Sequence, residues 1–307
     1  MREPWTTCSH VNRSYIERGT HAVRRYLGQL KAARPSLPQR STLFFSGVPG
    51  AVAFQAADGP LVRWAYRDTS LRSYYLNSFD LAKARRGPYF FFEFRGDSLI
   101  ETSGQRDQFF RIALGAILSG RPAAAREMLW AEQDRDSTAA RGTYYWLAWV
   151  NWDLGERDRA LELLGAARFP LVAGPTPEIA TALAALARRD TVGAWRLAQR
   201  ATSEHVLDAG AHELLSDLGF MVARAGAEPV IDAYAARLLA PGSAEAWRRW
   251  AFVQIQHNRP LEGAGSLRRY LDLAGAAGAR DEVAQDAVQY LRAKYPVTRR
   301  VLEPRPP

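Results

Sequence analysis

The chain of 307 residues is poor in several features, and each shortage excludes a class of protein. Cys8 is its one cysteine, so neither a disulfide within the chain nor a metal site built from several thiolates can form. The apolar runs, among them residues 43–45 and 89–92, fall far short of the roughly 18 residues that cross a bilayer, and no secretory signal pattern opens the sequence. We therefore expect a soluble chain without a membrane-spanning segment, either cytoplasmic or associated with the cell envelope.

Lysine is also scarce, because the only lysines are Lys31, Lys83 and Lys294, and arginine supplies the rest of a net charge of +9. Such an excess would suit a nucleic-acid partner if the cations formed a stripe. The arginine pairs are instead scattered along the chain, and arginine together with abundant alanine favours a GC-rich bacterial gene. We expect no nucleic-acid partner; the alternative predicts an association that depends strongly on salt.

Motifs that carry catalysis are missing as well. The five histidines show no spacing typical of metal ligands, and no nucleophile elbow, phosphate-binding loop or dinucleotide fingerprint is present. The sequence therefore predicts a protein that is not an enzyme, with no catalytic residue, no cofactor and no metal site.

The composition changes near residue 103, which predicts two domains, residues 1–103 and residues 104–307. Glycine and proline breaks and β-leaning runs dominate the first part. There we expect an amphipathic helix over residues 12–34, a strand over 41–48, a short helix over 70–79, and two strands over 89–101 joined at Arg95-Gly96-Asp97. The loop that follows residue 46 is interpreted as a joint of this small α+β unit, in preference to a catalytic loop.

The second part carries a repeat of helical hairpins. Its predicted turn residues are Gly120, Gly155, Arg189, Gly226 and Asn258, at intervals of 32 to 37 residues. A period of this length is typical of solenoids, in which no hairpin can bury its apolar face alone. We predict five antiparallel helical hairpins closed by a polar capping helix over residues 280–296.

The residue types inside these hairpins resemble the tetratricopeptide repeat (TPR) family. Large and small side chains alternate at the family's positions in the second hairpin, at Tyr144, Leu147, Ala148, Gly155, Ala160 and Leu164, and in the fifth, at Trp247, Trp250, Ala251, Asn258, Gly263 and Leu267. The resemblance implies a mainly α fold, a TPR-like stack of helical hairpins or α-solenoid. It also implies a non-enzymatic interaction module or scaffold.

In TPR proteins the first helix of each hairpin lines a concave groove that binds a peptide or helix of a partner. Carried onto this sequence, the resemblance implies that the partner-binding positions are aromatic or apolar, with one arginine: Phe110, Leu114, Tyr145, Trp149, Trp152, Phe220, Arg248 and Phe252. Either a protein partner occupies this groove, or the first 103 residues already fill it and make it part of the core.

Residues 5–80 also resemble the soluble tail region of bacterial membrane proteins of the glycosyltransferase or mannosyltransferase type. The alternative function is therefore the soluble tail of such an enzyme, associated with a membrane protein. This chain lacks the spanning helices of that pattern, so the transferase activity itself is not expected here.

Overall fold

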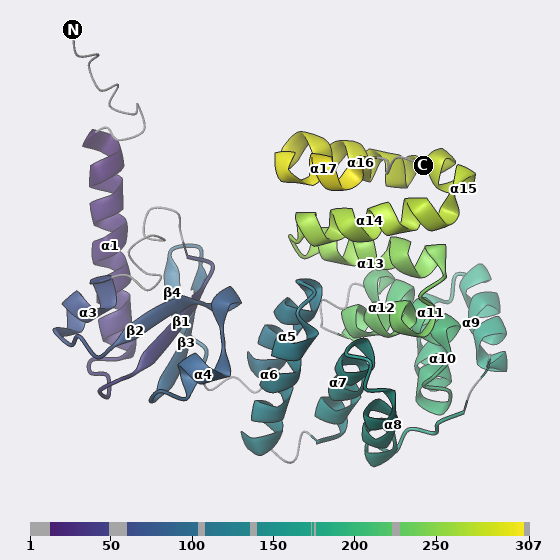
Figure 1. Ribbon diagram of the computed structural model, residues 1–307, viewed down its shortest axis with the longest axis horizontal. Coiled ribbons are helices and arrows are strands. Elements are labelled where there is room, and N and C mark those ends of the chain that lie inside the picture. The colour runs from purple at the N-terminus through teal and green to yellow at the C-terminus, as the bar shows by residue number, and fades with distance from the viewer. Residues whose placement is uncertain are drawn as a thin grey trace, which may run out of the picture. The chain divides into compact units, whose positions relative to one another are not determined.

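The computed structural model describes residues 13–48, 60–103, 108–135, 140–172, 174, 176–222 and 228–303. The chain divides into two compact units, Met1–Gln108 and Phe109–Pro307. The first combines helices with a sheet and the second is helical, so the predicted fold class is confirmed: mainly α, with helical hairpins and a small N-terminal α+β unit (Figure 1).

The N-terminal unit contains a four-stranded sheet in the order β2-β1-β3-β4. The central strand β1 (Thr42–Ser46) pairs in parallel with β2 (Arg72–Tyr75) and β3 (Tyr89–Arg95), and β4 (Ser98–Glu101) returns antiparallel to β3. The predicted tight turn between β3 and β4 is present, with Gly96 at φ 59°. The helices of the N-terminal unit are α1 (Arg13–Ala33), α3 (Pro60–Tyr66), the 3-10 turn η1 (Leu76–Ser78) and α4 (Leu81–Ala84).

One expectation for this unit is wrong. Residues 70–79 were expected to form a helix, but residues 72–75 form strand β2 and only a short 3-10 turn follows. Pairing with β1 decides the conformation: Ser73 and Tyr74 lie opposite Leu43 and Phe44 in register. Aromatic residues favour strands when a neighbouring strand offers them a packed surface, which outweighs a weak local preference for helix.

The two faces of the sheet are both packed, because side chains alternate along each strand. Leu43, Phe45 and Phe92 lie on one face, where they share a core with Tyr26 and Leu30 of α1. The other face carries a chain of rings, Phe44 with Tyr74, Phe79 and Phe91, at centroid distances of 4.6 to 5.9 Å.

Helix α1 is fixed along the edge of this sheet by polar contacts. Arg34 donates two hydrogen bonds to the Glu101 carboxylate, at 2.8 and 2.7 Å. Gln29 accepts from the Leu99 amide and donates to the Asp97 carbonyl. A bidentate guanidinium–carboxylate pair fixes orientation as well as distance, so the helix is held in register with β4.

The second unit consists of five successive helix pairs. Their bounds are α5 (Gln108–Leu118) and α6 (Pro122–Arg135), α7 (Ala140–Asp153) and α8 (Arg157–Ala166), α9 (Pro177–Ala187) and α10 (Thr191–Glu204), α11 (Ala209–Met221) and α12 (Glu228–Leu239), α13 (Ala244–Gln256) and α14 (Pro260–Ala274). Side-chain oxygens of Thr176, Asp190, Asp208 and Ser243 accept from backbone amides at the N-termini of α9, α10, α11 and α13.

The predicted turn residues end the first helices of these pairs. Gly120, Gly155, Arg189 and Asn258 all have positive φ, between 57° and 83°. Gly226, the fifth, lies outside the described residues. The left-handed conformation lets the backbone amide after the turn bond back to a carbonyl of the finished helix, as the Arg121 amide does with the Ala116 carbonyl at 2.9 Å.

The C-terminal segment packs on the last hairpin. It comprises α15 (Ala276–Arg280), α16 (Glu282–Lys294), the 3-10 turn η3 (Pro296–Thr298) and α17 (Arg299–Leu302). Val288, Leu291 and Leu302 bury their side chains against Leu267 and Tyr270 of α14. The expected capping helix is α16, whose apolar side completes the core of the fifth hairpin.

Helices far apart in the sequence also meet inside this unit. The buried Gln254 of α13 donates to the carbonyl of Leu118 at the end of α5, at 3.0 Å. Tyr234 of α12 donates to Asp153 at the end of α7, at 2.6 Å, and Arg237 lies 3.2 Å from the same carboxylate. The first two hairpins therefore pack directly against the last two, in addition to the contacts between successive pairs (Figure 1).

Candidate functional site

The residues expected to line an open groove lie partly inside the core. Trp149 is fully buried, at 0% exposure, and Phe220 is the one large exposed side chain among them, at 38%. The other six are half-buried: Phe110, Leu114, Tyr145, Trp152, Arg248 and Phe252.

Three of these residues lie together on α7. The Trp149 ring lies 6.0 Å from that of Tyr145 and 5.9 Å from that of Trp152. The rest have other neighbours: Phe110 contacts Trp146, and Arg248 lies over Phe252 while pairing with Asp281 at 2.6 Å.

The burial of Trp149 differs from the expectation of an exposed groove residue. Its ring packs edge-on against His212 of α11 at 5.2 Å, because α7 lies against the fourth hairpin. Trp149 is covered by helices of its own unit, an arrangement that the sequence did not predict. Trp149 is therefore core, and it cannot touch a partner without opening the contact between α7 and the fourth hairpin.

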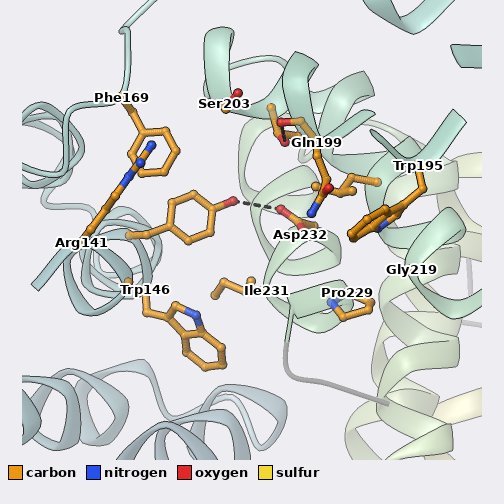
Figure 2. A pocket seen from close by; sticks show the side chains of 14 residues that line it. Arg141, Trp146, Phe169, Trp195, Gln199, Ser203, Gly219, Pro229, Ile231 and Asp232 are labelled. Carbon is orange, nitrogen blue, oxygen red and sulfur yellow. Dashed lines mark hydrogen bonds between the residues drawn. The ribbon is translucent and has the colours of Figure 1, made fainter. Parts of the chain in front are cut away.

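An open pocket of about 540 Å³ lies beside this contact. Its walls come from α7, α10, α11, α12 and the segment after α8. Four aromatic residues line it, Tyr145, Trp146, Phe169 and Trp195, and polar groups reach it from Arg141, Gln199, Ser203 and Asp232. Figure 2 shows Arg141 and Phe169 on one side and Trp195 on the other, with Asp232 and Gln199 between them (Figure 2).

A buried polar network forms the floor of the pocket. The Tyr145 hydroxyl donates to Asp232 Oδ1 at 2.9 Å, and His212 Nδ1 lies 2.9 Å from the same oxygen. His212 Nε2 lies 2.8 Å from the Val206 carbonyl, which can only accept, so Nε2 carries a proton and donates it. Both ring nitrogens of His212 are thereby engaged, and the ring is fixed between two helices.

The two carboxylate oxygens of Asp232 differ in their hydrogen-bond contacts. Asp232 is only 4% exposed, and its contacts to Tyr145 and His212 both reach Oδ1. Within the part of the chain that the structure describes, no hydrogen bond reaches Oδ2. Because Asp232 lines the pocket, this oxygen is the acceptor that the floor offers to a ligand with a hydrogen-bond donor.

The aromatic walls are held in place by the same helices. The Phe169 ring packs against Tyr145 at a centroid distance of 5.1 Å with a tilt of 35°, and the exposed Arg141 guanidinium lies 4.9 Å from the Phe169 ring centre. Trp146 is braced edge-on by Phe110 at 5.4 Å. Trp195 packs on the core between α9, α10 and α11. The site is thus a rigid aromatic pocket with an arginine at its rim and a carboxylate at its floor.

Of the pocket residues, sequence reasoning selected only Tyr145. The pair of His212 and Asp232 was missed, because the two residues are 20 positions apart on different helices of one hairpin. A signal was available, since each is a polar residue among apolar ones: His212 follows Ala211, and Asp232 lies inside the run Val230-Ile231-Asp232-Ala233. Polar residues at buried helix positions require partners, and the neighbouring helix is where to seek them.

The other strongly coupled charges hold helices together. Arg248 of α13 bonds Asp281, the N-cap of α16, and lowers the pKa of that carboxyl to about 2. Arg249 donates two hydrogen bonds to Asp217 of α11, at 2.6 and 2.8 Å. Within the described ranges no group of three or more histidine, cysteine or acidic side chains is placed to hold a metal ion.

Among the helices in the described part of the chain, none is both long enough and apolar enough to cross a bilayer.

Comparison with known proteins identifies no relative by sequence. No family model and no curated protein matches the chain. Among solved structures, the TPR2AB domain of yeast Sti1 in a complex with pHSP90 aligns with a TM-score of 0.34 and 12% identity, covering 62% of this chain and 86% of that chain. The assignment of a helical-hairpin fold rests on the helix pairs described above, and the resemblance of residues 5–80 to membrane-bound transferases finds no support in these comparisons.

Proposed function

We propose that the protein is a non-enzymatic interaction module of the TPR type, and that its helical unit binds an extended segment of a partner protein. The observation that carries this proposal is the pocket of about 540 Å³ lined by four aromatic rings. Its volume lies in the range of about 300–1,000 Å³ typical of specific ligand sites. Aromatic side chains held rigid in this way commonly supply most of the energy of a protein interface.

In this proposal the binding site is the pocket and not the open groove. Trp149 and its neighbours on the inner side of α7 are covered by α11 and α12, so those rings already have partners. Between α8 and α9 the chain runs through residues 167–176 before the third hairpin begins, and Phe169 of this segment lines the pocket. A partner side chain entering there would meet rings on both sides without displacing a helix.

The polar network at the pocket argues against His212 acting as a general base. A general base needs a free nitrogen or oxygen within hydrogen-bond reach of the proton it removes. His212 has none, since Nε2 donates to a carbonyl and Nδ1 is paired with Asp232. The network fixes α11 against α12 and holds the Tyr145 ring in the wall of the site.

The test fills the pocket and leaves the existing packing intact. Gly142 lines the pocket, and a Cβ built there meets no atom within 4 Å. Gly142→Trp should therefore occupy the pocket in a folded protein. Gly165→Trp is the matched control, because Gly165 is an exposed helical glycine of α8 with equal space around it and lies outside the pocket lining.

Random short peptides displayed on phage would be selected on the wild-type protein. The proposal expects enriched peptides that bind the wild type and the Gly165→Trp variant and lose binding to Gly142→Trp, with equal far-UV circular dichroism for all three. If no peptide is enriched, or if the enriched peptides bind all three proteins equally, the pocket is not a peptide site.

A further inference from the structure

We propose that the pocket selects an arginine side chain of its partner segment; this rests on the proposed function and specifies what the site recognises. The inference follows from the Asp232 carboxylate, which lies at the floor of a pocket whose walls are aromatic. These two features together complement a planar cation that carries several N–H donors.

The carboxylate supplies the first half of this recognition. Asp232 is 4% exposed, and its two hydrogen-bond contacts share Oδ1. Oδ2 is thus the oxygen for which the described residues supply no donor. A guanidinium can donate to it with an N–H group in a charge-assisted bond, which is about twice as strong as a neutral one.

The rings supply the second half. The faces of aromatic rings carry negative potential and attract cations, and arginine stacks on them better than lysine because its guanidinium is planar and weakly hydrated. The pocket already shows this preference at its rim, where the Arg141 guanidinium lies over the face of Phe169 at 4.9 Å. A second guanidinium placed between Phe169 and Trp195 would reach the floor at Asp232 (Figure 2).

The same features disfavour an acidic ligand. A carboxylate or phosphate entering the pocket would bring acceptor oxygens against Asp232 Oδ2, which is itself an acceptor, so no hydrogen bond could form at that oxygen. Arg141 lies at the rim and is exposed, so its attraction for an anion is screened by water. The acceptor at the floor therefore favours a ligand that carries N–H donors.

The experiment uses four pools of synthetic peptides that share randomised flanking positions and differ in one fixed central residue: arginine, lysine, citrulline or glutamate. Citrulline has nearly the shape of arginine without its charge, so the comparison needs no change in the protein. Each pool is applied to immobilised full-length wild type, Gly142→Trp, Asp232→Asn and Asp286→Asn, and the retained peptide is quantified. Asp286 is an exposed carboxylate on α16 outside the pocket lining and serves as the matched control.

We expect the wild type to retain the arginine pool about tenfold more than the citrulline pool, with lysine between them. Asp286→Asn should behave as the wild type, whereas Asp232→Asn, which keeps an acceptor for Tyr145, should bind arginine and citrulline equally. Equal retention of arginine and citrulline by the wild type, or a preference for glutamate, would overturn the inference while the pocket remains a peptide site. A preference for arginine over citrulline that persists in Asp232→Asn would also overturn the inference.

The failure of the proposed function has a different signature. In that case either no pool is retained, or the wild type and Gly142→Trp retain every pool equally, whatever the central residue. If Asp232→Asn does not fold, the comparison of arginine with citrulline on the wild type, repeated on Gly142→Trp, decides the question by itself.

Discussion

The fully buried Trp149 gives a direct test of how the helical unit is packed. Replacing a buried aromatic residue by alanine costs about 3–5 kcal/mol of stability. Trp149 is 0% exposed and its ring contacts Tyr145, Trp152 and His212, which favours a large loss. Its Nε1 is buried without a hydrogen-bond partner among the described residues, so removing this donor recovers about 1 kcal/mol. The expected loss for Trp149→Ala is therefore about 3 kcal/mol.

Thermal unfolding followed by far-UV circular dichroism measures this loss. For a unit of this size each kcal/mol lowers the midpoint by about 2–4 °C, so Trp149→Ala should melt about 6–12 °C below the wild type. Trp64→Ala is the control, because Trp64 is 73% exposed and its removal should change stability by less than about 0.5 kcal/mol. If Trp149→Ala melts within about 2 °C of the wild type, the ring does not lie between α7 and the fourth hairpin, and the pocket described here does not exist in this form.

Three further predictions test the packing of the hairpins, one of their turns and an ion pair between helices. Gly263→Ala in α14 should cost about 1–3 kcal/mol in urea unfolding, because its Cβ would lie 2.7 Å from a side-chain carbon of α13, whereas Gly265→Ala, with no atom within 4 Å, should gain about 0.5–1 kcal/mol; equal effects would contradict this packing. Arg189→Gly should stabilise the protein by about 1 kcal/mol by relieving φ of 63°, and a loss would show that the turn is not left-handed. Arg248→Met should cost about 1 kcal/mol at neutral pH. Hydrogen bonds from Arg248, which contributes most, and from Tyr270 and the Ala284 amide together lower the folded-state pKa of Asp281 from 3.8 to about 2. The cost of Arg248→Met should therefore shrink as the pH falls through that interval, and a pH-independent cost would refute the ion pair.

The hairpins could be predicted from the sequence because their signals are local. Gly120, Gly155 and Asn258 are residues that tolerate positive φ, and each follows an apolar helix and precedes the next one at a similar interval. Arg189 has no such preference, yet the spacing alone located its turn correctly. Helix ends depend on neighbouring residues, and the repeat length can be counted along the sequence. Composition and spacing are therefore enough to find both.

The candidate site could not be predicted in the same way, because it depends on contacts across the repeat. The resemblance to TPR proteins implied an inward face shared by all first helices, which selected Tyr145 but placed Trp149 on an open surface. In the structure α7 meets α11 and α12 through His212 and Asp232, residues that belong to no repeat position. Strand β2 was missed for the same reason, since its partner β1 is 30 residues away.

These long-range contacts also support the proposal that a partner binds at the pocket and not along the inner face of α7. The contacts between the first two hairpins and the last two include hydrogen bonds between polar groups that point inward, such as Asp153 with Tyr234 and Gln254 with the Leu118 carbonyl. Opening them to admit a partner would leave buried donors and acceptors without partners, at about 1–3 kcal/mol for each group. The pocket needs no such opening, because its rings and the Asp232 carboxylate already face an accessible space. A partner bound at the pocket, as proposed, would therefore keep these contacts intact and meet the Asp232 oxygen to which no described residue donates.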